Sequence, residues 1–158
     1  MLHRLTCYSL LGLLLVVAAG CKKQETPPEK PHTHTHSHVA PQGGVLAELG
    51  EEAYHIEFKH GDTAGVVQAF VMDGHAENFI RSDQPAFAAK GRSGGQELTL
   101  EFKAVASSAS GEKVGDTSLF EATTGLPGRP AIAITVPAFP LKGQVYHDIT
   151  AQLPAGKP

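Results

Sequence analysis

The chain has 158 residues, with 13 Lys or Arg against 16 Asp or Glu, which gives a formal net charge of -3. No basic stripe and no basic patch interleaved with aromatic residues occurs, which argues against nucleic acid as a partner. Its cysteines are Cys7, inside the N-terminal apolar stretch, and Cys21, just after it. The residues after Cys21 therefore hold no disulfide and no thiolate ligand, and about 110 of them are enough to bury a core.

The first twenty residues indicate an export signal. The apolar run Leu10–Ala19 follows a head that contains Arg4 and is too short to span a bilayer core of about 30 Å. Small residues end this run directly before Cys21, as in a lipobox, so we predict a lipoprotein signal peptide over residues 1–20 and diacylation of Cys21. Two acyl chains anchor a protein stably, here on the periplasmic or outer face of a bacterial membrane. The absence of Asp after the cysteine favours the outer membrane, and ordinary secretion with cleavage near Ala19 is the alternative.

Residues 21–42 are predicted to form the lipidated cysteine and a disordered linker. This segment is rich in proline, charged residues and histidine and contains hardly any apolar side chains. Such a composition cannot bury a core.

Four alternating histidines in this linker form what we call the His-rich tract, namely His32, His34, His36 and His38. A spacing of two places their imidazoles on one side of an extended chain. Neutral imidazole is a common metal ligand, and without thiolates borderline ions are preferred over Cu(I). The tract therefore predicts binding of Zn(II), Cu(II) or Ni(II), and a soluble spacer that is incidentally His-rich is the alternative.

After the linker the pattern changes to short β-like runs divided by turn residues. In the clearest run, Tyr54–Lys59, alternation predicts that Ile56 and Phe58 face the core while His55 and Glu57 face outward. The other expected strands are 45–49, 66–72, 97–102, 119–122, 131–136 and 144–151, with 79–87 ambiguous and 91–95 interpreted as a flexible turn. We predict an all-β fold over residues 43–154, an antiparallel β-sandwich of immunoglobulin-like or related topology with about seven to eight strands.

A secondary metal site within this domain is a weaker hypothesis, with His55, Glu57 and His75 as ligands. His55 and Glu57 share one strand face, and a hairpin brings His75 close to His55. A solvated sheet face is the favoured alternative for the first two residues. His60 is expected to be exposed at a turn, and His147 to be structural or solvated.

Catalytic motifs are absent from the sequence, and we predict that the protein is not an enzyme. There is no Gly-x-Ser-x-Gly elbow, phosphate loop or free cysteine nucleophile. His55 and Glu57 have the His-x-Glu spacing of zinc deaminases, but the paired cysteines of those enzymes are missing.

Three segments resemble a small β-domain of bacterial lipoproteins that also occurs in the N-terminal region of some periplasmic adaptor subunits of heavy-metal efflux pumps: Pro41–Gly50, Ala53–Phe58 and Val66–Asp73. In that family a His-rich tract precedes a Gly-Gly pair, a Tyr-His-x-Glu-like strand and a hydrophobic strand ending in Asp. This chain departs from the pattern at Gln42, where a histidine is common, and it lacks the long helical hairpin of an adaptor. The resemblance implies metal-related work in the cell envelope, with efflux components as candidate partners.

Two functions of different classes follow as expectations. The first is an envelope lipoprotein that binds divalent transition-metal ions through its His-rich tract, as a buffer or as an accessory to heavy-metal efflux. The second is a structural or protein-interaction β-sandwich whose tether is incidentally rich in histidine.

Overall fold

The computed structural model describes residues 38–157, so the predicted signal peptide, Cys21 and the first three histidines of the tract lie outside the described residues. Within that part all regular structure is β, with eight strands and no helix, which confirms the predicted fold class. The strands are β1 (Val45–Leu49), β2 (Tyr54–His60), β3 (Val66–Asp73), β4 (Ala86–Ser93), β5 (Gln96–Ala104), β6 (Leu119–Thr123), β7 (Ile132–Leu141) and β8 (Gln144–Leu153).

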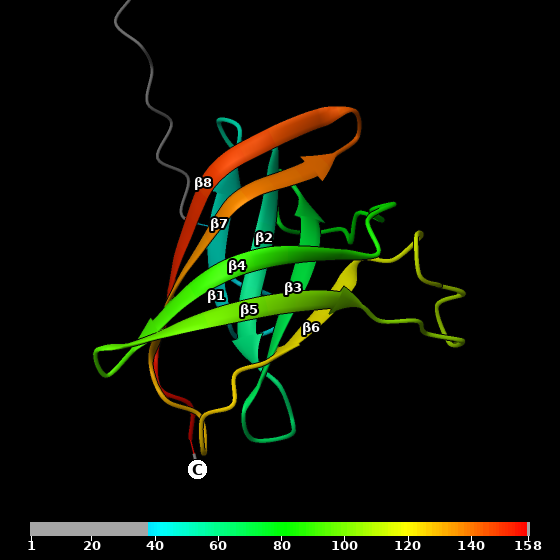
Figure 1. Ribbon diagram of the computed structural model, residues 1–158. Coiled ribbons are helices and arrows are strands. Elements are labelled where there is room, and N and C mark those ends of the chain that lie inside the picture. The colour runs from blue at the N-terminus through cyan, green and yellow to red at the C-terminus, as the bar shows by residue number, and fades with distance from the viewer. Residues whose placement is uncertain (1–37, 158) are drawn as a thin grey trace, which may run out of the picture. The chain divides into compact units, whose positions relative to one another are not determined.

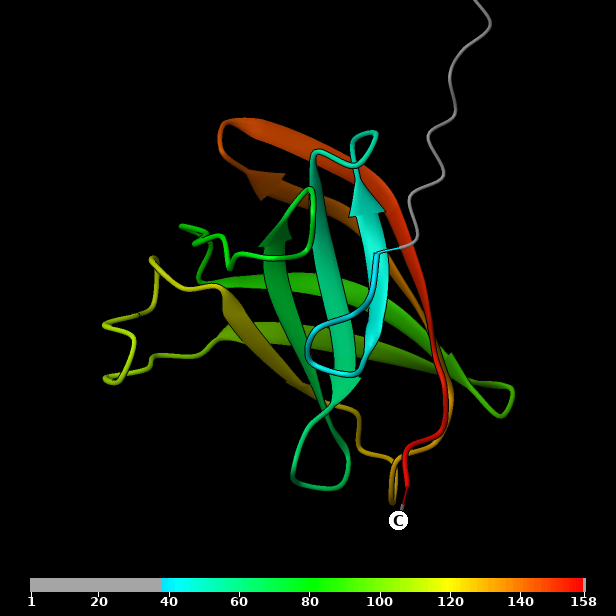
Figure 2. The ribbon, with the colours of Figure 1, turned by 180° about the vertical axis from the view of Figure 1, so that it is seen from behind.

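All eight strands belong to one antiparallel sheet with the order β1-β2-β3-β6-β5-β4-β7-β8. The sheet curls until its last strand, β8, lies beside its first, β1 (Figures 1 and 2). At this junction the ring of Tyr146 in β8 meets Tyr54 edge-to-face, with centroids 6.1 Å apart, and leaves no room for a side chain at Gly50. The predicted sandwich thus takes the form of a single sheet whose two halves face each other across the core.

The core is built around phenylalanines from five strands. The ring of Phe87 in β4 stacks on Phe102 in β5 at a centroid distance of 4.8 Å. Phe120 and Phe139 contact Phe87 edge-to-face at 5.2 and 5.0 Å, and Phe58 contacts Phe102 at 5.6 Å. Burial of each such side chain contributes about 1.5–3 kcal/mol, so this cluster ties both halves of the sheet together without a disulfide.

Two segments differ from the sequence-based expectation. Residues 91–93, interpreted as part of a flexible turn, are the end of β4, and only Gly94 and Gly95 form the turn into β5. Strand β7 continues past Pro137 to Leu141, whereas the prediction ended at residue 136. Proline is tolerated there because β4 pairs with β7 only over Ala133–Thr135, which leaves that side of the later residues without a ladder to break.

Candidate functional site

The outer face of β2 is covered rather than solvated. Ile56 and Phe58 face the core, as the alternation predicted, and His55 and Glu57 lie on the opposite face. Both are nevertheless buried, with only 1% and 0% of their surface exposed, so the expectation of a solvated sheet face is wrong. The cover consists of the segment before β1, residues 38–44, which passes in front of β2 in Figure 2, and the loop after β3, residues 74–80.

The carboxylate of Glu57 fastens the first of these segments. It accepts hydrogen bonds from the backbone N–H of Gln42, at 3.0 Å to each oxygen, and of Gly44, at 2.7 Å. Gly44 is required here because a Cβ at this position would collide with the carbonyl oxygen of Phe58. The backbone donors of Gln42 and Gly44 thus satisfy the buried carboxylate, which gives Glu57 a structural role in this conformation.

His55 is held in one tautomer by a backbone carbonyl. Its Nδ1 lies 3.2 Å from the carbonyl oxygen of Asp73 at the end of β3. A carbonyl oxygen can only accept, so Nδ1 carries the proton, and in the neutral ring Nε2 keeps its lone pair. Histidines that ligate metals commonly show this arrangement, because the second hydrogen bond orients the ring and makes the ligating nitrogen more basic.

Asp73 also shapes the loop that carries His75. Its carboxylate accepts hydrogen bonds from the side-chain amide of Asn78 at 2.6 Å and the backbone N–H of Glu77 at 2.9 Å. These bonds, with that of the Asn78 amide the strongest, hold the pKa of Asp73 below its ordinary value. The carbonyl of Asp73 accepts from the N–H of Ala76 at 3.0 Å, so the turn that presents the exposed His75 is tightly closed.

Three imidazoles meet on this face, and we call them the histidine cluster: His38, His55 and His75. The ring centroid of His38 lies 5.1 Å from that of His55 and 6.1 Å from that of His75, both at an interplanar angle of 63°. A surface cavity of about 380 Å³ adjoins two of them and is lined by His38, His55 and Glu48, among others. The hairpin of β2 and β3 was expected to bring His75 near His55, and in the structure both rings contact His38.

The place of His38 was not anticipated from the sequence, which assigned this residue only to the tract. The signal that could have revealed it is the turn Pro41-Gln42-Gly43-Gly44, which reverses the chain just before β1 and returns the preceding residues over β2. Among residues 38–157, no group of three or more His, Cys, Asp or Glu side chains is already arranged to hold a metal ion. The histidine cluster is therefore not a ligand set in this conformation.

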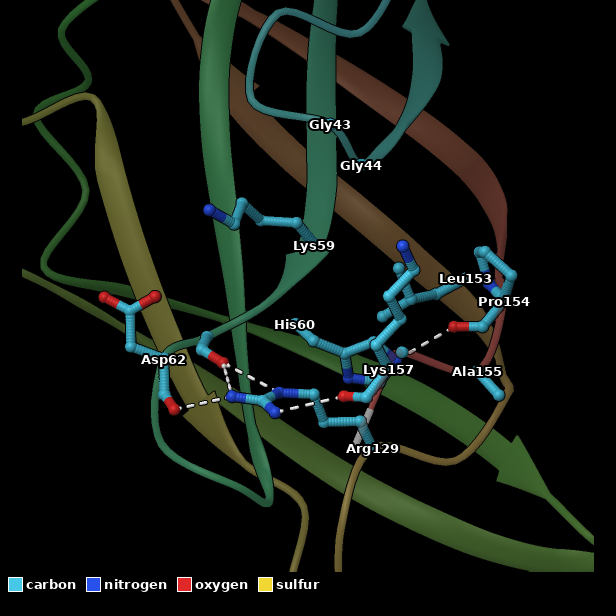
Figure 3. Close-up of a pocket in the computed structure, with 12 residues that line it drawn as sticks. Gly43, Gly44, Lys59, His60, Asp62, Arg129, Leu153, Pro154, Ala155 and Lys157 are labelled. Carbon is cyan, nitrogen blue, oxygen red and sulfur yellow. Dashed lines mark hydrogen bonds between the residues drawn. The ribbon is translucent and has the colours of Figure 1, made fainter.

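A second cavity of about 310 Å³ lies at the other end of β2 and is lined by the C-terminal segment (Figure 3). Nη2 of Arg129 donates to the carbonyl oxygens of Gly61 and Asp62, at 3.2 and 2.6 Å, and Nη1 donates to that of Lys157 at 3.2 Å. Nε2 of His60 lies 2.9 Å from the carbonyl oxygen of Pro154. These contacts engage Arg129 and His60 in fastening the end of the chain, which makes this cavity structural.

The remaining domain histidine, His147, is exposed on β8.

Comparison of the chain with protein-family models, with curated proteins and with solved structures found no match. In the part of the chain that the structure describes, no helix is long and apolar enough to cross a membrane.

Proposed function

We propose that this protein is a lipid-anchored protein of the bacterial cell envelope that binds divalent transition-metal ions through the imidazoles of its His-rich tract, as a buffer or as an accessory to metal efflux. The observation that supports this most is the contact of His38, the last residue of the tract, with His55 and His75. A tether that served only as a spacer would gain nothing from ending against two further imidazoles of the domain.

The residue types favour borderline divalent ions. The candidate ligands are imidazole nitrogens and the carboxylate of Glu48, which lines the same cavity. The domain contains no cysteine. The domain's one methionine, Met72, is buried in β3, with 1% of its surface exposed, and is not available as a soft ligand. Zn(II), Cu(II) and Ni(II) suit such a set, and Cu(II) should bind most tightly of the three.

A metal titration tests this proposal. In the purified mature protein, replacement of His32, His34, His36 and His38 with Ala should remove most of the Zn(II) or Ni(II) binding seen by isothermal titration calorimetry. The matched control replaces Thr33, Thr35 and Ser37 with Ala, which leaves the imidazoles intact and should preserve binding. The proposal fails if the four-alanine variant binds as tightly as the parent, or if the parent binds no divalent ion at micromolar concentration.

The alternative, a protein-interaction domain, has one observation in its favour. Val39 and Phe79 are 83% and 50% exposed, and they lie on the two segments that cover the outer face of β2. Exposed apolar side chains of this kind can serve as contacts for a partner. Substitution of both with Ser should leave metal binding unchanged under the metal proposal, and absence of metal binding by the parent would favour the interaction role.

A further inference from the structure

The distances within the histidine cluster agree with those of imidazoles that share one ion. Two rings bound through nitrogens at about 2.0–2.1 Å from a tetrahedral ion have centroids about 5 Å apart, and somewhat more at wider angles. The centroids of His38 and His55 are 5.1 Å apart, and those of His38 and His75 are 6.1 Å apart. The first pair already matches the expected separation, and the second needs a shift on the order of 1 Å or a wider angle.

The three rings differ in how firmly they are held. His55 lies in the middle of the sheet, is 1% exposed and has its Nδ1 fixed by the carbonyl of Asp73. His38 and His75 lie on non-strand segments at the surface, and His75 is exposed. His55 therefore supplies one fixed nitrogen, and the exposed ring of His75 can rotate toward an ion. Because no group among residues 38–157 is arranged as a complete ligand set, binding requires such an adjustment.

The surroundings suit a cation. Glu48 pairs with His55 in the β1–β2 register, so its side chain lies on the same face of the sheet, and it lines the adjoining cavity. Its exposed carboxylate brings negative charge to a site whose other members are neutral when they ligate. The opening of the cavity to solvent leaves a coordination position for water or for exchange with another ligand.

We infer that His38, His55 and His75 form a site for one divalent transition-metal ion on the folded domain, with Nε2 of His55 as its fixed ligand. This inference rests on the proposed function and deepens it, because it separates a site on the domain from the preceding histidines of the tract. His38 belongs to both, so an ion held by the tract can reach the domain without leaving the protein. The open coordination position makes the site one that can accept and release ions.

A titration of a three-alanine variant, which lacks the earlier histidines of the tract, tests this site. The variant with His32, His34 and His36 replaced by Ala keeps His38 and should still bind one Zn(II) per chain by calorimetry. In that background His75→Ala, and separately His38→Ala, should weaken binding by about tenfold or more. The matched control is His147→Ala, which removes an exposed imidazole on β8 and should change nothing. Far-ultraviolet circular dichroism verifies that each variant is folded.

A spectroscopic measurement avoids mutation of the buried His55. On addition of Zn(II) to the same background, the nitrogen resonance of His55 Nε2 should shift to that of a metal-bound nitrogen, while Nδ1 stays protonated. The domain site is refuted if the three-alanine variant binds no metal although the parent does. It is also refuted if His75→Ala and His38→Ala in that variant leave the affinity unchanged. In either case the His-rich tract remains as the metal-binding segment. If the parent itself binds no metal, both the domain site and the proposed function fail.

Discussion

The buried carboxylate of Glu57 accepts a 2.7 Å hydrogen bond from the backbone N–H of Gly44, a residue that precedes it by 13 positions. This contact joins the segment before the first strand to the outer face of the second. It fixes residues 42–44 on that face, in the same short segment as His38, whose ring lies against His55. One hydrogen-bonded carboxylate thus connects the stability of the fold to the geometry of the candidate metal site.

Substitution Glu57→Gln should destabilise the domain by about 1–3 kcal/mol, because the neutral amide accepts through one oxygen only and turns its N–H₂ group toward the backbone N–H of Gln42. Urea unfolding followed by circular dichroism measures this loss. The matched control, Glu101→Gln, removes a carboxylate from an exposed pair with Lys103 and should change stability by less than about 0.5 kcal/mol. Equal effects of the two substitutions would contradict the anchoring role of Glu57.

Acid should loosen the loop that carries His75. Hydrogen bonds from Asn78 and Glu77 lower the pKa of Asp73, whose ordinary value is 3.8. A carboxyl group whose folded pKa is depressed stabilises the fold above its unfolded pKa, and that contribution disappears as the pH falls through the folded value. Hydrogen exchange of the Glu77 and Asn78 amides should therefore accelerate below about pH 4 relative to neighbouring strands, once the intrinsic pH dependence of exchange is removed. Asp73→Asn should show the faster exchange already at neutral pH.

The pKa of Glu112 is also lowered, so its effect on acid stability has to be distinguished from that of Asp73. Its partial burial would raise the pKa, but hydrogen bonds from Ser118 and Ser110 and the charge of Arg81 outweigh this and lower it. Because Glu112 lies in the loop between β5 and β6, Glu112→Gln should affect exchange in that loop and leave the amides of Glu77 and Asn78 unchanged. Equal protection changes in both loops for either variant would contradict this assignment.

Protons should compete with metal for the His-rich tract. Protonated imidazole cannot ligate, and the ordinary pKa of histidine is about 6.5, so affinity for Zn(II) should fall as the pH is lowered from 7.5 through about 6. Calorimetry at several pH values, in buffers with different ionisation enthalpies, also counts the protons released on binding. Binding that is constant over this range would point to carboxylate ligands instead.

The domain should fold without metal, because its phenylalanine core is complete among the described residues. Addition of chelator should leave the thermal midpoint of metal-free protein unchanged. Saturating Zn(II) should raise it, since a ligand at 100 times its dissociation constant stabilises the folded state by about 2.7 kcal/mol. Loss of the β signal in circular dichroism on chelation would show that metal is part of the fold.

Lipidation is tested on the precursor. Mass spectrometry of the protein expressed in a bacterium should find a mature chain that begins at diacylated Cys21 and partitions with membranes. Cys21→Ser should block acylation and leave the precursor unprocessed. A soluble mature form with a different first residue and no lipid would refute the anchor.

The strands and their inward faces could be predicted because alternation is a local property, as in Ile56 and Phe58. Burial of His55 and Glu57 could not be predicted in this way, since it depends on two covering segments that have no hydrophobic period. The end of β4 was missed because Gly91 lies in it, where a Cβ would come within 3.2 Å of Leu98 and Leu100. A glycine needed for close packing looks, in a sequence, like one needed for a turn.

The neighbouring positions of β1 and β8 affect how readily the protein aggregates at high local concentration. Unprotected edge strands are templates on which a second chain can add its own strand, which is a common route to aggregation. Here the first and last strands of the sheet shield each other, and both partners belong to the same molecule. If the proposed lipid anchor concentrates these molecules on a membrane surface, they meet one another often, and this mutual shielding would let them collide without pairing their sheets.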